Sequence, residues 1–150
     1  MIQNDKEDKI IKVLLVDDEK GFLDTITKRL EKRELKVWAV YSGEDALTEL
    51  KNNTAIEVVV LDVKMPGMDG IETLVEIKQR FPLMEVIMLT GHATVETAID
   101  GMKLGAFDYL LKPCDIDVLI SKVNEATEKK RQHDEKIMEA RIKEISDRMV

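Results

Sequence analysis

The chain has 150 residues, about the length of one domain, and its 44% apolar and 35% charged residues predict a packed core rather than a disordered chain. The formal net charge is −7, and because residues 124–150 hold seven acidic and seven basic side chains, the whole excess lies on residues 1–123. An acidic body disfavours direct contact with nucleic acid and favours a cation or a basic partner, and the single cysteine, Cys114, excludes an intramolecular disulfide and a multi-cysteine zinc cluster.

The N-terminal segment, MIQNDKEDK, is polar, and we expect residues 1–9 to be mobile. It contains no apolar stretch of the kind that secretory signals carry. No run of residues along the chain approaches the roughly 18 consecutive apolar residues of a membrane span. The sequence therefore predicts a cytoplasmic protein that does not contact a membrane.

Short apolar runs then alternate with segments of helical periodicity. The runs typical of buried strands are 11–16, 35–40, 57–61, 85–89 and 107–111. Apolar residues at helical spacing predict helices around 22–30, from Ser42 to about residue 50, from about 71 to Pro82, over 94–104, and from about Asp115 onward. The segment 64–70 is rich in Pro and Gly and predicts a loop.

This alternation predicts an α/β fold. Strands that read as continuous Val, Ile and Leu runs, each followed by a helix, indicate a parallel sheet covered on both faces. Right-handed crossovers then make the five-stranded sheet doubly wound. In such sheets the functional site lies outside the carboxyl ends of the strands, so the residues that follow each strand carry the chemistry.

Polar side chains stand at four of these strand ends: Asp17 and Asp18 after the first strand, Asp62 after the third, Thr90 after the fourth and Lys112 after the fifth. Three carboxylates at one edge repel one another and call for a cation, and Mg²⁺ is the hard ion that also binds phosphate oxygens. One carboxylate can then attack a phosphoryl group, whose three oxygens are met by the metal, by Lys112, and by the Thr90 hydroxyl with a backbone N–H.

Four motifs in this order, LLVDDE, LDVKMPGMDGIE, LTGHAT and DYLLKP, resemble the receiver domain of bacterial two-component response regulators over about residues 10–124. The stretch TGHATVETAIDGMKLGAFDYLLKP is similar to receivers of the AAA+ enhancer-binding activators of the nitrogen-regulation type. The resemblance implies a flavodoxin-like strand order of 2-1-3-4-5 with five helices, and a role in phosphorelay signal transduction.

For the acidic residues, the resemblance implies that Asp62 is the phosphoacceptor. Its phosphoryl group would come from a phosphohistidine on a sensor histidine kinase or a histidine phosphotransfer protein. Asp17 and Asp18 match the acidic pair that holds Mg²⁺ together with Asp62 and the backbone carbonyl of Lys64. The domain is then a phosphoacceptor that catalyses its own phosphotransfer and dephosphorylation, and it is not a turnover enzyme.

For the switch, Thr90 and Lys112 match the residues that engage the phosphoryl oxygens. Tyr109 matches the aromatic residue that turns inward when the threonine moves, and Lys112–Pro113 matches a cis peptide bond. The resemblance implies that phosphorylation changes the surface of residues 94–123, formed by the fourth helix, the fifth strand and the fifth helix. That surface would bind partners or form a homodimer.

Three alternatives stay open. A Mg²⁺-dependent phosphohydrolase with an Asp nucleophile usually has a second Asp two residues later, where this chain has Lys64. The chain could be a constitutive dimerisation module with a vestigial acidic site. It could also be the receiver of a larger transcriptional activator whose effector domains are absent. The G-x-x-x-x-G-K-[ST] motif, which the ATPase domain of such an activator would carry, does not occur in the 150 residues.

Residues 125–150 contain no Gly or Pro and predict a helical extension of the last helix, with a frayed linker as the alternative. An unbroken helix from Asp115 to the end is about 54 Å long. Four apolar residues step by 4, 3 and 4, like a short heptad seam: Met138, Ile142, Ile145 and Met149. Extending the seam backwards reaches Arg131 and Glu135, which break it. We expect this helix to pair with a second chain.

Overall fold

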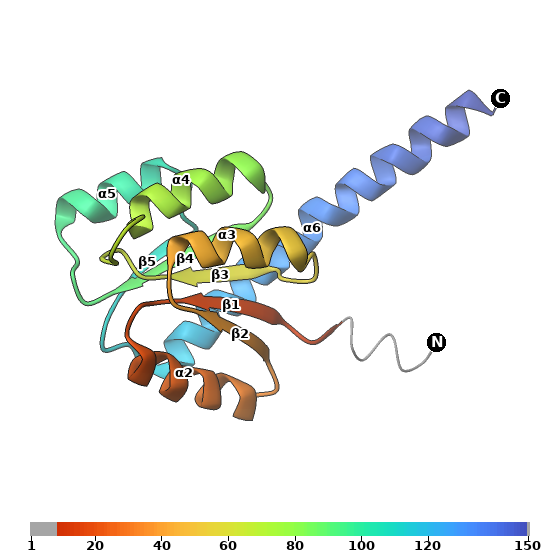
Figure 1. Cartoon of the computed structure of the whole chain (residues 1–150). Coiled ribbons are helices and arrows are strands. Elements are labelled where there is room, and N and C mark those ends of the chain that lie inside the picture. Colours follow the sequence, from red (N-terminus) through yellow and green to blue (C-terminus); the bar gives the residue numbers. More distant parts are fainter. Residues whose placement is uncertain (1–8, 150) are drawn as a thin grey trace.

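The structure is a computed structural model that describes residues 9–149 (Figure 1). Its strands form one five-stranded parallel sheet in the order β2-β1-β3-β4-β5. The strands are β1 (Lys12–Val16), β2 (Lys36–Val40), β3 (Val58–Leu61), β4 (Glu85–Thr90) and β5 (Asp108–Leu111). The helices that follow them are α2 (Lys20–Lys32), α3 (Gly43–Asn52), α4 (Gly70–Arg80), α5 (Val95–Lys103) and α6 (Ile116–Arg148). The predicted doubly wound sheet and its strand order are confirmed.

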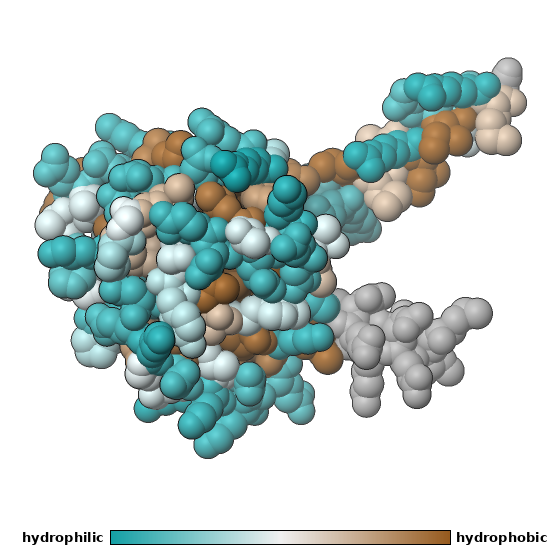
Figure 2. Space-filling view, in the orientation of Figure 1, coloured by the Kyte–Doolittle hydropathy of each residue, from teal (hydrophilic) through white to brown (hydrophobic). Residues whose placement is uncertain are grey.

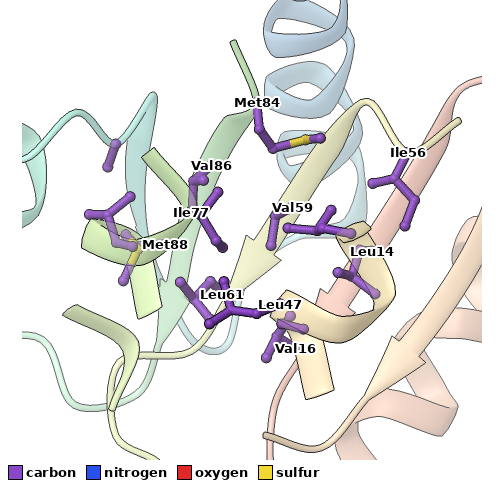
Figure 3. Packing of buried hydrophobic residues seen from close by; sticks show 14 of the residues in the cluster. Leu14, Val16, Leu47, Ile56, Val59, Leu61, Ile77, Met84, Val86 and Met88 are labelled. Atoms are coloured by element: carbon purple, nitrogen blue, oxygen red, sulfur yellow. The ribbon is translucent and has the colours of Figure 1, made fainter. Parts of the chain in front are cut away.

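Apolar residues cover both faces of the sheet because successive side chains of a strand point to opposite faces. On one face, strand residues such as Leu14, Val59 and Met88 pack against α3 and α4 (Figure 3). On the other face, α2 and α6 cover a second cluster that includes Leu15 and Val60. All four residues of β3 are buried, as expected for a central strand of a parallel sheet.

Four of the five helices in residues 9–149 begin at residues whose side chains cap them, and α2, which begins after Glu19, is the exception. Ser42, Asp69, Thr94 and Asp115 each accept a hydrogen bond from a backbone N–H in the first turn of the following helix. The cap at Ser42 was predicted from the sequence, and so was the start of the last helix near Asp115. These caps decide where each connection leaves the sheet edge, and so they position the residues that follow the strands.

The last helix is much longer than the body that it covers. Leu119, Val123 and Ala126 of α6 are buried against the sheet, whereas the residues beyond Arg131 extend away from it (Figure 1). The predicted helical extension is therefore present, and α6 crosses the expected boundary at residues 124–125 without a break. The expected division into a receiver at 10–124 and an extension at 125–150 stays a prediction.

Two further expectations concern the chain as a whole. The mobile segment expected at residues 1–9 lies outside the described residues except for Lys9. Within residues 9–149, none of the helices combines the length and the apolar composition that a membrane crossing requires.

Candidate functional site

Three carboxylates meet at the carboxyl edge of the sheet. Asp17 and Asp18 follow β1, Asp62 follows β3, and one side-chain oxygen of each lies within 4.8 Å of the others. Asp17 and Asp62 are each only 2% exposed, whereas Asp18 is open to solvent. The register of β1 with β3, in which Val16 stands beside Leu61, brings the two strand ends level. The predicted acidic cluster is thus assembled by neighbouring strands.

Lys112 enters this cluster from the end of β5. Its Nζ donates to Asp17 Oδ2 at 2.5 Å and lies 3.7 Å from Asp62 Oδ2. The ammonium also stands 4.1 Å from the centre of the Phe22 ring, at the start of α2. The peptide bond between Lys112 and Pro113 is cis, as the family resemblance implies.

The electrostatics of the cluster follow from its burial. Burial raises the pKa of Asp17, and hydrogen bonds from Lys112 and from the Glu19 N–H only partly offset this effect. Burial alone would lower the pKa of Lys112, but its hydrogen bond to Asp17 and the nearby charges outweigh it, so that the pKa of Lys112 is raised. Three carboxylates and one ammonium leave two formal negative charges. This donor set fits a divalent cation with oxygen ligands.

The acceptor candidate and the predicted switch hydroxyl are both held by backbone hydrogen bonds. Asp62 Oδ1 accepts a hydrogen bond of 2.8 Å from the Val63 N–H, so that its other oxygen faces Lys112. Thr90 is completely buried at the end of β4, and its Oγ1 accepts a hydrogen bond of 3.0 Å from the His92 N–H. The loop after β3 lies tightly against Asp62, because a Cβ on Gly70 would come within 2.1 Å of the Asp62 carbonyl oxygen.

Tyr109 is placed by α5. Its hydroxyl is 3.0 Å from Thr97 Oγ1, and its half-buried ring packs beside Gly101, where an added Cβ would lie 3.5 Å from a ring carbon. The same Thr97 Oγ1 also belongs to the capping box that begins α5 with Thr94. The aromatic side chain predicted to move is therefore tied to the start of α5 by one hydrogen bond.

Several residues at the site were not singled out from the sequence. Phe22 contacts Lys112, and Thr97 contacts Tyr109. Of the two, only Phe22 has a signal in the sequence, namely its position soon after the acidic pair Asp17 and Asp18. Lys64 is exposed in the loop after β3, and the role of its backbone carbonyl as a metal ligand stays a prediction.

Comparison with known proteins identifies the family. A family model described as the response regulator receiver domain matches residues 13–124, which is more than half of the chain. The chain therefore belongs to the response regulator receiver domain family, whose members act in two-component signal transduction. This membership agrees with the resemblance seen in the four motifs, and it favours a receiver over a phosphohydrolase.

The similar curated proteins include transcriptional regulators of the nitrogen-regulation type. The DNA-binding transcriptional regulator NtrC of Klebsiella pneumoniae is 38% identical over 112 residues, which cover 75% of this chain and 24% of NtrC. The transcriptional regulatory protein ZraR of Salmonella typhimurium is 39% identical over 109 residues, which cover 73% of this chain and 24% of ZraR. The chain thus spans about a quarter of the length of the curated relatives that it matches.

Solved structures agree with this family and fold. A response regulator receiver domain protein from Clostridium thermocellum is 39% identical with a TM-score of 0.78, and the match covers 82% of this chain and 98% of that one. NtrX from Brucella abortus is 30% identical with a TM-score of 0.77, and the match covers 84% of this chain and 28% of NtrX.

Proposed function

We propose that this receiver is a switch that accepts a phosphoryl group on Asp62 from a phosphohistidine of a sensor kinase or a histidine phosphotransfer protein. A carboxylate oxygen of Asp62 attacks the phosphorus, the P–N bond breaks, and the imidazole nitrogen keeps the bonding electrons. Water later attacks the phosphorus of the resulting mixed anhydride, the bond to Asp62 breaks, and inorganic phosphate leaves. The carboxylate is restored, so the domain catalyses its own phosphorylation and dephosphorylation without converting an external metabolite.

The position of Lys112 carries this proposal. Its Nζ pairs with Asp17 and lies 3.7 Å from Asp62, within a short movement of any group attached to Asp62. Asp17, Asp18, Asp62 and the carbonyl oxygen of Lys64 are the groups that would hold Mg²⁺. When bound, this cation supplies charge compensation for an incoming phosphoryl group and orients its oxygens.

The switch follows from two hydrogen bonds that must be exchanged. The Thr90 hydroxyl accepts from the His92 N–H, and to donate to a phosphoryl oxygen it must move toward Asp62. Tyr109 can follow only by giving up its hydrogen bond to Thr97 on α5. One neutral hydrogen bond contributes about 1 kcal/mol, so the inactive arrangement is held weakly enough for phosphorylation to shift it.

The surface that responds is the switch face, residues 94–123. It exposes large apolar side chains from α5, β5 and the start of α6, and such a patch is typical of an interaction site. These side chains are Val95, Ile99, Met102, Leu104, Leu111 and Val118. We propose that the face changes its affinity for a partner or for a second copy of the chain, in the cytoplasm and without direct contact with nucleic acid.

The test is the intact mass after incubation with Mg²⁺ and acetyl phosphate. We expect the addition of one phosphoryl group, which disappears with EDTA and in the variant Asp62→Asn. The matched control is Asp100→Asn, because Asp100 is an exposed carboxylate on α5 outside the acidic cluster. This variant should be labelled like the wild type.

Two outcomes would contradict the proposal. If no donor labels the wild type, the acidic site is vestigial and the chain is a constitutive interaction module. If Asp62→Asn is labelled as fully as the wild type, the acceptor is another residue.

A further inference from the structure

A groove lies at the amino edge of the sheet, on the side opposite the acidic cluster. It has a volume of about 1350 Å³ and opens between the chain before β1, the end of α2 with the start of β2, and α6. Its apolar wall consists of Ile10, Ile11, Leu35, Val37 and Ile120. The rest of the lining is polar or charged: Lys9, Glu31, Arg33, Glu34, Lys36 and Asn124. Because Ile120 and Asn124 belong to α6, the groove runs beside the part of α6 that the body covers.

The extension of α6 carries an unpartnered apolar stripe. Met138, Ile142 and Ile145 are 57%, 59% and 57% exposed, and Met149 is 84% exposed. Figure 2 shows hydrophobic residues along one side of the projecting helix and hydrophilic residues along the other. α6 thus borders the groove at Ile120 and Asn124 and carries the stripe further along, at residues 138–149.

Both surfaces face the same side of α6. Asn124, Arg131, Met138 and Ile145 are spaced by seven residues, and residues at this spacing drift by only about 20° per step around a straight helix. Asn124 lines the groove, and Arg131 reaches the carbonyl oxygens of Lys9 and Ile10 at 3.4 Å beside it. A helix laid in the groove would consequently continue along the stripe.

We infer that the occupant of this groove is the α6 extension of a second copy of the chain, bound reciprocally so that each stripe enters the groove of the other copy. This contact is separate from the switch face of residues 94–123 and does not depend on phosphorylation of Asp62. Along α6, His133 lies about midway between the residues that border the groove and the residues of the stripe. A two-fold axis at His133 would therefore bring the stripe of each copy onto the groove of the other copy. The two α6 helices then run antiparallel.

The dimensions agree with this arrangement. A helix of 12 residues with side chains, the length from 138 to 149, is a cylinder of about 1400 Å³. The groove, with a volume of about 1350 Å³, is large enough to receive one side of such a helix.

Buried area favours the groove over a contact between two tails. Four apolar side chains contribute roughly 100 Å² each, so two stripes packed on each other bury about 800 Å² in total. That is the size of a crystal contact, and specific interfaces bury more than about 1,000 Å². Two tail-in-groove contacts bury both stripes and, in addition, both groove walls, and so they pass this threshold.

The experiment compares dimerisation of single variants by analytical ultracentrifugation of the full chain. Ile142→Glu places a charge in the stripe, and Ile10→Glu places one in the groove at a residue that is 37% exposed. We expect each change to weaken dimerisation at least about tenfold, and a mixture of the two variants to dimerise more strongly than either variant alone, because the mixed dimer keeps one unaltered contact. Ala140→Glu is the matched control, because residue 140 lies about 200° around the helix from residue 142.

A monomeric wild type, or full dimerisation of Ile10→Glu, would overturn the inference. The second result would indicate a contact of tail on tail. Asp62→Asn should dimerise through α6 like the wild type, so the phosphorylation proposal can fail independently.

Cross-linking tests the contact without relying on a destabilising charge. In a Cys114→Ala background, Ile10→Cys combined with Met138→Cys should give a disulfide-linked dimer under mild oxidation. Met138→Cys alone should remain unlinked. If Met138→Cys alone forms the linked dimer and adding Ile10→Cys does not increase its amount, the two α6 extensions contact each other. That result would contradict binding in the groove.

Discussion

Lys112 is the residue on which the acidic site depends. Without a cation, its ammonium compensates the buried Asp17 and stands near Asp62, and the ring of Phe22 shields it from water on another side. A phosphoryl group on Asp62 would offer Lys112 a more strongly charged partner. Lys112 would leave Asp17 only if another cation took its place, so under the proposed function Mg²⁺ binding would accompany the movement of Lys112.

Cys114 lies two residues beyond Lys112, and its chemistry can be tested separately. Burial raises the pKa of its thiol, and the charge of Asp115 acts in the same direction. A raised pKa leaves less thiolate at pH 8, so we expect alkylation of the native protein to be several-fold slower than that of the same chain in urea. Intact mass against time gives both rates. Equal rates would show that the folded environment does not protect the thiol.

At the scale of elements, β3 and β4 connect two ends of the molecule. They carry Asp62 and Thr90 at their carboxyl ends, and α6 is attached at their amino ends. Arg131 binds Glu57 through two hydrogen bonds of 2.6 and 2.9 Å, and Lys129 lies 3.6 Å from Glu85, which is only 3% exposed. These contacts set the direction in which the extension leaves the body.

The end of α2 carries local strain that a substitution can relieve. Glu34 has a φ of 67°, in a left-handed conformation that favours glycine, and the backbone hydrogen bonds from Leu35 to Leu30 and from Glu34 to Glu31 close a Schellman motif. We expect Glu34→Gly to raise the free energy of unfolding by about 0.5–1 kcal/mol. Urea unfolding measures it.

The control for this prediction removes the same side chain from within the helix. Glu31→Gly is expected to lower the free energy of unfolding by about 1 kcal/mol, because glycine is unfavourable in a helix interior. If Glu34→Gly also lowers the free energy of unfolding, the side chain of Glu34 stabilises the fold by more than its left-handed backbone conformation destabilises it.

At the scale of the whole molecule, the hydrogen bond between Thr97 and Tyr109 ties β5 to the start of α5 within the switch face. Thr97→Val removes it and should favour the inward position of Tyr109 by about 1 kcal/mol, roughly fivefold. Because coupling is reciprocal, we expect the affinity for beryllofluoride with Mg²⁺ to rise by the same factor. Titration followed by NMR of the Tyr109 region measures it.

Thr97→Ser is the matched control, since it keeps the hydroxyl and should bind beryllofluoride like the wild type. An unchanged affinity in Thr97→Val would indicate that Tyr109 does not move with the site. A reduced affinity would indicate that Thr97 supports the active arrangement instead.

Much of this molecule could be predicted because its signals are local. The apolar runs mark the strands to within about two residues, and the polar residues that end them converge as the parallel topology requires. The sequence did not reveal the contacts made by Phe22, Thr97 and the carboxylates of Glu57 and Glu85. Each of these contacts a residue far along the chain, and no local pattern encodes such a partner.

The heptad seam shows the same division. Its residues are visible in the sequence, and so is the break that Arg131 and Glu135 make in it. In the structure, Arg131 instead anchors α6 to Glu57 beside the groove.

By itself, the sequence determined the fold, the family and the identity of the acidic cluster, because these follow from periodicity and from the residues that stand at strand ends. Only the tertiary structure decided that Lys112 pairs with Asp17, that Tyr109 is held by α5, and that groove and stripe share one side of α6. The physical reason is that such contacts depend on the packing of distant segments, which sets distances and burial that no single segment contains.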